Sequence, residues 1–575
     1  MLCRIFLIQY PMPKTFKAKV IKVSENYVTA KVDKSKVLIY GDYNFNFDQT
    51  ISYSGTYQKI FSPKSKYGFQ FDNYMLNNNI MYSIKAKNIK EVKKPESIRS
   101  KLYSKIKKHP DRELLSKLIL KINHSDLDFH ILSMIASAGV VIKTLIYFIK
   151  KVLSLFFYPK KVFLCELFLL CFFMFIFKHY LFYVNIIFYT LLKKSDLENV
   201  DALFISASII LFIDPLYLFS LSFIINFLFR LIPYVSLNKG FKFIEGLIVI
   251  LPIQLRLFYK ADIFSILAYR YYKIIATVAF IFAFIDLSLM SRLTKIFISF
   301  FDVKLFSFNV SGHLNNLLLF LWIFFSLLAL SRNKFFYKLA LVFIIVLNQN
   351  QLLFNPSLIY TQLYVGQGDC TLIRYPFAKD ILMIDTGPPN GANKLTAFLD
   401  YYGVKEISTL IISHDDLDHS GNKDLLKENY LVKNIVEKSA TVKFHNLKLY
   451  AENFNMQDIN ENSLITYFKV NDEVYLSLGD VSKRVEKMFL NKYSNLNPSI
   501  VKLGHHGSDT STSVELLEEE SIKLLLNSSG YNNMYKHPNH LVMSRILKYG
   551  LPFIDTQQVG DIEIIHFLSF NFLAY

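Results

Sequence analysis

Four side chains that can bind metal ions lie close together in the segment LIISHDDLDHSGN, residues 410–422: His414, Asp416, Asp418 and His419. The apolar run before them is typical of a buried β-strand, so they are expected in the loop that ends this strand. Imidazole and carboxylate groups at this spacing can bind two adjacent divalent cations, and such a pair supports displacement at phosphorus. Taken alone, the segment also fits a solvated polar loop that caps a helix.

Further polar groups follow predicted strands elsewhere in the C-terminal part of the chain. Asp480 ends one such strand, where a carboxylate can bridge two metal ions, and His505 with His506 ends another. Active sites are often built from side chains on loops of this kind. The segments are YVGQGDCTLI (364–373), ILMIDTG (381–387), VYLSLGD (474–480), IVKLGHHGSDTSTS (500–513) and YKHPN (535–539).

In this order, and behind a hydrophobic region, these motifs resemble the ComEC family. Its members are the inner-membrane channels of bacterial natural transformation, and their C-terminal domain has the metallo-β-lactamase fold. The resemblance implies two divalent metal ions, zinc or manganese. Their ligands would be side chains at the strand ends: His414, Asp416, Asp418, His419, Asp480 and His505.

The same resemblance gives roles to neighbouring side chains. One of His505 and His506 would be the late histidine ligand, and we assign His505 to the metal and His506 to catalysis. Asp418 would also act in catalysis, and His537 would donate a hydrogen bond to the transition state. Two acids of the first motifs would support the ligands: Asp369 and Asp385.

One metal-binding histidine that the fold usually places between the main loop and the bridging aspartate is missing. The segment INENSLITYF, residues 459–468, occupies its place, which leaves one metal ion short of a ligand. His445, in the segment VKFHNLKLY, is interpreted as an ordinary strand residue.

The composition places this site in a large and apolar chain. The sequence has 575 residues, of which 52% are hydrophobic, 16% aromatic and 19% charged, which excludes a disordered protein and is not typical of a soluble enzyme. The formal net charge is +19; the positive excess lies within residues 1–355, whereas residues 356–575 hold more acidic than basic side chains. The two parts are therefore expected to meet different partners. Four scattered cysteines exclude a disulfide framework.

Residues 14–94 alternate between apolar and polar side chains, with turn residues between the runs, which predicts short antiparallel strands. A segment of this length has room for one small barrel of about five strands, compatible with the oligonucleotide-binding (OB) barrel of the ComEC family. Lysines interleaved with aromatic rings suit single-stranded DNA. A solubilising lysine surface with the rings in the core fits equally well. The DNA-binding candidates are Lys17, Lys19, Lys31 and Tyr40.

Long apolar runs dominate residues 131–354, which predicts a polytopic α-helical membrane domain of about six to eight segments. Basic pairs flank the runs at both ends, so their distribution gives no orientation. Charged side chains within such runs are unfavourable in lipid, and Arg230 and Arg256 are therefore candidates for lining a path for polyanionic DNA. For each arginine, snorkelling to the membrane surface is an equal alternative.

Together, these features predict a multi-domain chain: an OB-like β-barrel at 1–110, a polytopic membrane domain at 111–355 and an αββα metallo-β-lactamase-like domain at 356–575. The resemblance implies a multi-pass channel in the bacterial inner membrane. It would take up single-stranded DNA during natural transformation while the C-terminal domain, as a nuclease, degrades the other strand. The alternatives are a membrane-anchored hydrolase of another phosphodiester and a transporter with a vestigial hydrolase domain.

The predicted partners are membrane lipid and DNA, as a duplex outside the cell and as a single strand in transit. No GxxxxGK[ST] segment is present, so ATP-driven pulling would need a separate protein. A separate DNA receptor is also expected, and the resemblance is compatible with a homo-oligomer.

Overall fold

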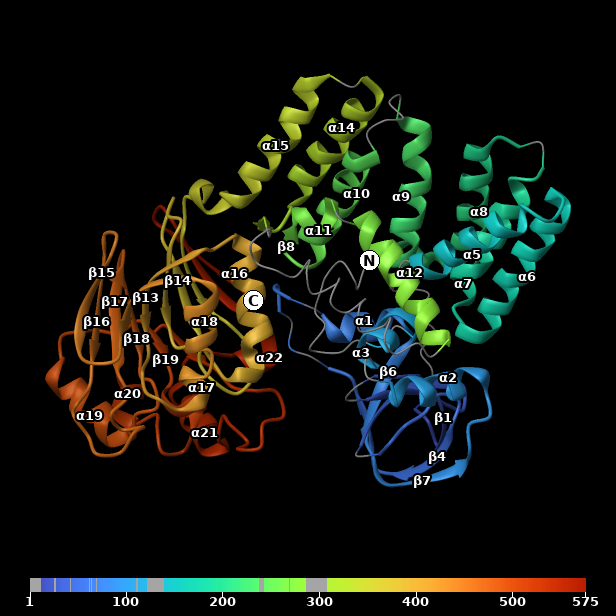
Figure 1. Ribbon diagram of the computed structural model, residues 1–575. Helices are drawn as coiled ribbons and strands as arrows, with labels where there is room; N and C mark the ends of the chain where they lie inside the picture. Colours follow the sequence, from blue (N-terminus) through green and yellow to red (C-terminus); the bar gives the residue numbers. More distant parts are fainter. Residues whose placement is uncertain are drawn as a thin grey trace.

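The structure is a computed structural model that describes residues 12–24, 27–41, 43–61, 63, 65–68, 70–109, 112–120, 122, 139–195, 197–236, 242–267, 269–285, 308–332 and 334–575. Strands come first along the chain, helices follow, and a second set of strands with short helices ends it (Figure 1). Parts of two predicted domains lie outside the described residues. They are residues 1–11 of the first predicted domain and residues 123–138 and 286–307, which the sequence assigns to the membrane domain.

The first region is a seven-stranded sheet in the order β5-β6-β3-β2-β1-β4-β7. Its strands form where apolar and polar residues alternate: in β1, Ala18 and Val20 are buried, and Lys17 and Lys19 are exposed. β1 pairs antiparallel with β2 and β4, while β3 runs parallel to β6. The elements are β1 (Lys17–Val23), β2 (Val28–Val32), β3 (Ser35–Tyr40), β4 (Thr50–Ser54), β5 (Tyr57–Lys59), α1 (Phe71–Asn77), β6 (Ile80–Lys85) and β7 (Lys87–Lys93).

The sheet is larger than the barrel of about five strands that the sequence predicts, so that strand number is wrong. Two segments account for the difference. One is the short strand β5, and the other is the run from Ile80 to Lys93, which divides at Ala86 into β6 and β7. Within the described residues, β5 and β7 each pair with one neighbour and form the two ends of the sheet.

The second region consists of helices and one small hairpin, β8–β9. The apolar run at 163–192 forms two helices, α6 and α7, because Lys178 adopts a left-handed conformation between them. The next helix, α8, ends before Asp214, whose carboxylate accepts a hydrogen bond from the Leu216 amide at 3.1 Å. Measured against the length and hydropathy of a membrane-crossing segment, every helix in the described ranges falls short.

The elements of this region are α2 (Ile98–Lys107), α3 (Arg112–Leu115), α5 (Val140–Leu153), α6 (Pro159–Phe177), α7 (Tyr180–Leu192), α8 (Asn199–Ile213), α9 (Leu221–Val235), α10 (Lys242–Leu257), β8 (Lys260–Asp262), α11 (Ile263–Leu267), α12 (Tyr269–Ile285), β9 (Asn309–Ser311), α14 (Asn316–Arg332) and α15 (Phe335–Gln349).

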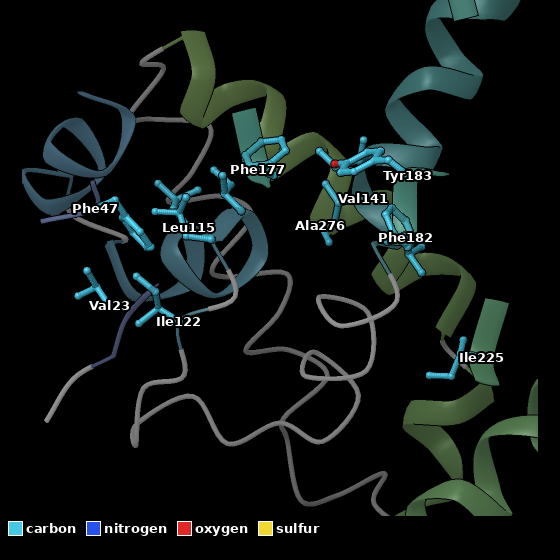
Figure 2. Packing of buried hydrophobic residues seen from close by; sticks show 14 of the residues in the cluster. Val23, Phe47, Leu115, Ile122, Val141, Phe177, Phe182, Tyr183, Ile225 and Ala276 are labelled. Atoms are coloured by element: carbon cyan, nitrogen blue, oxygen red, sulfur yellow. The ribbon is translucent and has the colours of Figure 1, made fainter. Parts of the chain in front are cut away.

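One hydrophobic core joins the first sheet to the helices. Val23 and Phe47 of the first region belong to the same buried cluster as Val141 of α5 and Phe177 of α6 (Figure 2). The core therefore runs across residue 110, where the sequence places a domain boundary.

The C-terminal region contains two seven-stranded sheets. The first has the order β14-β13-β12-β11-β10-β22-β23, and the second has the order β15-β16-β17-β18-β19-β20-β21. β11 and β12 are buried along their whole length, because both faces of their sheet are covered.

The elements of the C-terminal region are β10 (Leu358–Gln362), β11 (Thr371–Arg374), β12 (Ile381–Ile384), α16 (Ala392–Tyr402), β13 (Glu406–Ile411), α17 (Leu417–Ser420), α18 (Lys423–Asn429), β14 (Leu431–Val436), β15 (Ala440–Phe444), β16 (Leu447–Glu452), β17 (Ile465–Val470), β18 (Glu473–Ser477), α19 (Lys483–Lys492), β19 (Ile500–Lys502), α20 (Val514–Leu517), β20 (Leu524–Asn527), α21 (His540–Tyr549), β21 (Phe553–Asp555), α22 (Thr556–Val559), β22 (Ile562–Phe567) and β23 (Phe570–Ala574).

Three buried clusters divide the C-terminal region into layers. The cluster between the sheets contains Tyr360 from the first sheet and Leu449 from the second. Phe398 of α16 belongs to a cluster on the outer side of the first sheet, and Phe489 of α19 to a cluster on the outer side of the second. Helices thus cover both outer faces of a two-sheet sandwich, in agreement with the αββα prediction.

A short loop between β5 and α1 inserts into the C-terminal region. Ser65 Oγ and the Lys66 amide donate hydrogen bonds to Asp561 Oδ2, at 2.7 and 2.9 Å. Tyr67 is 1% exposed, and its hydroxyl donates to Glu563 Oε1 at 2.5 Å. Its ring is part of the core on the outer side of the first C-terminal sheet. This loop therefore fixes the first region against the C-terminal region.

We expect Tyr67→Ala to lower the free energy of unfolding by about 3–5 kcal/mol, because a buried aromatic ring is lost. Tyr67→Phe keeps the ring and should lower it by only about 1 kcal/mol. Denaturant unfolding of the full chain, followed by fluorescence, measures both values. Equal stability of Tyr67→Ala and the parent chain would contradict the docking of this loop.

Candidate metal centre

The predicted site residues lie at the edge where parallel strands of both C-terminal sheets end. β12 and β13 pair in parallel in the first sheet, as do β18 and β19 in the second. Asp385 follows β12, His414 follows β13, and Asp480 and His506 follow β18 and β19. Because the carboxyl ends of parallel strands meet at one edge, the sandwich brings together side chains that are far apart in the sequence.

Two of the motif loops make close contact at this edge. The amide of Asp369 donates a hydrogen bond to the carbonyl of Asp418 at 3.0 Å. The preceding residue, Gly368, has a φ of +145°, and a Cβ at this position would clash with the same carbonyl oxygen. Glycine therefore allows the segment VGQGD to approach the loop 414–419.

Asp480 faces two histidines with its two carboxylate oxygens. Its Oδ1 lies 3.2 Å from His419 Nε2, and its Oδ2 lies 3.8 Å from His506 Nε2. His414 completes a group of possible ligands with His419 and Asp480. Asp418 completes a second group with His419 and His506, and in each group the ligand atoms lie within 4.8 Å of one another. The arrangement suits a carboxylate that bridges two cations.

Several of these atoms are buried without a hydrogen-bond partner among the residues described: Nε2 of His414, His419 and His506, and Oδ1 of Asp480. Two of these nitrogens face carboxylate oxygens as ion pairs: His419 Nε2 lies 3.2 Å from Asp480 Oδ1, and His506 Nε2 lies 3.2 Å from Asp418 Oδ2. Leaving a buried polar atom unsatisfied costs roughly 1–3 kcal/mol. Imidazole nitrogen and carboxylate oxygen are ligands that Zn²⁺ and Mn²⁺ accept. The side chains present therefore fit divalent cations.

Asp385 holds His419 in the orientation that such a centre needs. Asp385 Oδ2 lies 2.8 Å from His419 Nδ1, which leaves Nε2 directed at the centre. The same carboxylate accepts hydrogen bonds from the amide and the hydroxyl of Ser413, at 2.7 and 2.9 Å. This is the position that the supporting role predicted for Asp385 requires.

Lys502, which the sequence analysis missed, supplies a buried positive charge. It is 1% exposed and forms an ion pair with Asp369. Asp369 Oδ1 in turn lies 3.4 Å from His506 Nδ1, which is also 2.9 Å from the Ser528 carbonyl. The carbonyl and the charge of Asp369 thus both face the side of His506 that points away from the centre. One signal in the sequence could have indicated it: a lysine ends the otherwise apolar strand IVK just before the two histidines.

The charges of the centre shift the pKa values of its side chains. Burial lowers the pKa of His506, but Asp480 and Asp369 outweigh this effect and raise it to about 10. Burial also opposes the charge on His419, yet Asp480 and Asp385 raise its pKa well above the usual range. For Asp480, burial opposes ionisation, and the charges of His419 and His506 nevertheless hold its pKa well below the usual range. Imidazolium and carboxylate charges therefore balance one another here.

Three predicted residues lie outside these ligand groups. Asp416 is half exposed. His505 is partly exposed, with its Nε2 3.7 Å from Asp480 Oδ2, whereas His506 occupies the buried position. His537 lies beyond His505, with 6.0 Å between their ring centroids. The late histidine ligand is therefore better placed at His506 than at His505, the reverse of the assignment from the sequence.

Ser463 lies where the segment 459–468 replaces the missing histidine. Its hydroxyl lies 3.2 Å from His414 Nδ1 and accepts a hydrogen bond from the Asp480 amide at 3.2 Å. Ser463 thus contacts two candidate ligands without belonging to either ligand group. His445 lies away from the centre, 2.9 Å from Asp380.

The predicted DNA-binding lysines lie on an exposed face of the first sheet. Lys19 stands directly opposite Lys31, and Lys31 stands opposite Lys36, in the register of β1, β2 and β3. Lys17 is exposed two positions before Lys19. Like charges that stand opposite each other destabilise a sheet, so this row favours a polyanionic partner.

The other three DNA-binding candidates have partners within the fold. Tyr40 is half-buried against the core of the first region. The guanidinium of Arg230 lies over the ring of Tyr189, 4.2 Å from its centroid. Arg256 donates hydrogen bonds to the Leu314 carbonyl and to Asn316 Oδ1, at 2.9 and 2.8 Å.

We expect Asp385→Asn to weaken divalent-metal binding about 10- to 100-fold, because His419 loses the carboxylate that orients it. Asp380→Asn is a matched control, since Asp380 precedes the same strand, β12, and contacts His445 away from the centre. Competition with a chromogenic chelator measures both affinities. Parent-like affinity in Asp385→Asn would contradict this role.

Comparison with known proteins places the C-terminal region in a fold family. Residues 363–479 match the profile of the Metallo-beta-lactamase superfamily. The solved structure of the metallo-beta-lactamase fold protein YhfI from Bacillus subtilis is 8% identical, with a TM-score of 0.27, over 35% of this chain and 98% of that one. The family match, together with the four layers, assigns a metallo-β-lactamase fold to this region.

Three curated relatives resemble parts of the chain. ComE operon protein 3 of Bacillus subtilis is 24% identical over 246 residues, 35% of this chain and 32% of that protein. Competence protein ComA of Neisseria gonorrhoeae is 30% identical over 216 residues, 34% and 31% of the two chains. Recombination protein 2 of Haemophilus influenzae is 27% identical over 226 residues, 35% and 28%. The chain spans about a third of the length of the curated relatives that it matches.

Proposed function

Because the chain is related to the competence proteins of the ComEC family, as its motifs predict, we propose that it acts in DNA uptake during bacterial natural transformation. In this proposal, duplex DNA arrives outside the inner membrane, and the C-terminal region degrades one strand. The helical region forms a channel for the other strand. A separate receptor delivers the DNA, and a separate ATP-driven protein pulls it.

One observation carries the nuclease part of this proposal: buried atoms of His414, His419, His506 and Asp480 converge at one edge of the sandwich, without a hydrogen-bond partner among the described residues. We assign them to two divalent cations, zinc or manganese, with Asp418 as a further ligand. When bound, such cations supply Lewis acidity for the hydrolysis of a phosphodiester.

Side chains beyond the ligands would contact the phosphate. His505 and His537 lie at the exposed rim of the centre. Burial lowers the pKa of His537, and the neighbouring His506 and His505 lower it further, so its imidazole is neutral at pH 7 and has one N–H to donate. We assign to His537 a hydrogen bond to the phosphate oxygen that gains charge in the transition state.

Exposed apolar side chains support a location in the bacterial inner membrane. Phe168 and Phe175 of α6, Phe320 of α14 and Phe335 of α15 are all largely exposed. Apolar surface of this extent marks an interface with a membrane or with another protein. We therefore propose that the helical region contacts lipid and passes through the membrane more than once.

The lysine row supports an OB-like, DNA-binding role for the first region. OB barrels bind oligonucleotides on the face formed by their second and third strands. Lys31 and Lys36 lie on β2 and β3, and their row continues to Lys19 on β1. We propose that this face binds the phosphates of single-stranded DNA.

A second candidate function is a membrane-anchored hydrolase that acts on another phosphodiester. One observation favours it: Arg256, a candidate for lining the DNA path, is engaged with Leu314 and Asn316. A vestigial hydrolase domain is disfavoured, because imidazole and carboxylate groups able to bind a cation still converge at the strand ends. A DNA-uptake assay distinguishes the two candidate functions, because an anchored hydrolase of another phosphodiester would not be required for DNA uptake.

We expect the double change Lys19→Ser/Lys31→Ser to weaken binding of single-stranded DNA and to reduce its salt dependence. Each phosphate contact that is lost should lower the slope of log K against log salt by about 0.7. The control is Lys443→Ser/Lys448→Ser, an exposed lysine pair that stands directly opposite in β15 and β16. Fluorescence anisotropy at several salt concentrations measures the slope. Identical slopes for both double variants would show that the row on the first sheet only solubilises the protein.

We expect Asp418→Ala to slow metal-dependent cleavage of duplex DNA on the order of 100-fold or more, because a ligand of the centre is lost. Uptake of labelled duplex by cells should fail with it, whereas a supplied single strand should still enter. Asp424→Ala, in the exposed first turn of α18, is the matched control. Blotting of membranes checks the abundance of each variant. Normal cleavage and normal duplex uptake in Asp418→Ala would contradict the proposed nuclease.

A further inference from the structure

Exposed aromatic rings lie beside the metal centre. In the first region, Tyr53 and Tyr57 are buried, and their hydroxyl oxygens lie 2.5 Å apart. In contrast, the loop that joins β20 to α21 exposes Tyr531, Met534 and Tyr535, at 50, 84 and 62%. Three large, neighbouring apolar side chains that water surrounds suggest a surface that meets a ligand.

This loop is held in one shape by hydrogen bonds of its own. Asn533 Nδ2 donates to the carbonyls of Gly530 and His537, at 2.8 and 2.7 Å, and Asn533 Oδ1 accepts from the His537 amide at 2.9 Å. At its start, the Tyr531 amide donates to the hydroxyl of Tyr364, just before the VGQGD motif, at 3.2 Å. A surface that is ordered before a ligand arrives loses less entropy on binding.

The exposed rings continue directly to the metal centre. The ring of Tyr535 is stacked on His537, with 5.7 Å between centroids and 26° between planes. His537 in turn lies 6.0 Å from the ring of His505, whose Nε2 lies 3.7 Å from Asp480 Oδ2. A base on Tyr535 would therefore lie near a phosphate at the centre.

Positive charge borders the same rim. The guanidinium of Arg545 holds the loop after His506, because its Nη2 donates to the Ser511 carbonyl at 3.1 Å. Lys536, between Tyr535 and His537 in the sequence, is exposed. Rings and cations on one rim match a ligand with both bases and phosphates.

The ring surface also reaches the first region. Phe61, in the loop after β5, contacts Tyr531 with 4.8 Å between ring centroids. In Figure 1, α17 and α21, which flank the centre in the fold, lie at the edge of the C-terminal region away from α14 and α15. Phe320 of α14 and Phe335 of α15 are among the side chains assigned above to lipid, so α21 lies apart from that part of the exposed apolar surface.

We propose that Tyr531 and Tyr535 form a stacking surface for unpaired bases of a DNA strand whose phosphodiester lies at the metal centre. This inference rests on the proposed nuclease function and names its substrate: a single-stranded segment or a frayed duplex end, since bases inside a duplex are already stacked on each other. Stacking accepts every base, so the surface gives no sequence preference.

The test uses the full chain with EDTA, so that binding is measured without cleavage. The probe is an oligothymidylate with one 2-aminopurine, whose fluorescence falls when the base stacks on a ring. Tyr531→Ala/Tyr535→Ala should bind it roughly 5- to 100-fold more weakly and lose the quenching. Tyr531→Phe/Tyr535→Phe keeps both rings and should behave like the parent chain. The control Tyr575→Ala removes another exposed tyrosine of this region. A blunt duplex of the same length should bind to the parent chain and to Tyr531→Ala/Tyr535→Ala with equal affinity.

Parent-like binding and quenching in the alanine variant would overturn the inference, even where the parent chain cleaves DNA. Equal losses for single strand and blunt duplex would overturn it too, because the rings would then not contact bases. A third arm uses phosphatidylglycerol vesicles: a vesicle affinity that depends on the two tyrosines, with unchanged DNA binding, would assign the surface to lipid instead. Ring-dependent quenching in a parent chain that cannot cleave DNA would support the stacking surface and reject the nuclease.

Discussion

Buried imidazole and carboxylate atoms that have no hydrogen-bond partner in the described part of the chain set the main constraint on this fold. His414 and His419 follow β13 of the first sheet, whereas Asp480 and His506 follow β18 and β19 of the second. Their buried atoms meet at one edge. Such atoms are costly in a protein interior unless a cation binds them. The two-sheet sandwich makes their meeting possible, because stacking the sheets brings these three strand ends to the same edge.

The side chains around the centre orient the candidate ligands so that these atoms can bind a cation. Asp385 fixes His419 through one ring nitrogen, and the buried pair of Asp369 and Lys502 supports His506 from behind. The carboxylates therefore have partners on their outer sides and leave the inner atoms for a cation. The exposed rim beyond His505 carries rings and positive charges, as expected for the entry of a nucleic acid.

The strand-end motifs could be predicted because each is local: an apolar strand is followed at once by an acid or a histidine, as at Asp480 and His506. What was missed depends on contacts between distant parts of the chain. Lys502 meets Asp369 only when the two sheets stack, and Tyr67 finds its pocket only in the folded C-terminal region. The burial of aromatic rings in the first region could not be predicted either, because alternation alone does not show which face of a strand is covered by other elements.

The most direct test of the account is the metal content of the purified full chain, measured by mass spectrometry after loading with zinc or manganese and dialysis. We expect about two equivalents per chain, and fewer in Asp480→Ala, because this carboxylate faces both His419 and His506. Less than about half an equivalent in the parent chain would contradict it, since a functional two-metal centre must be filled.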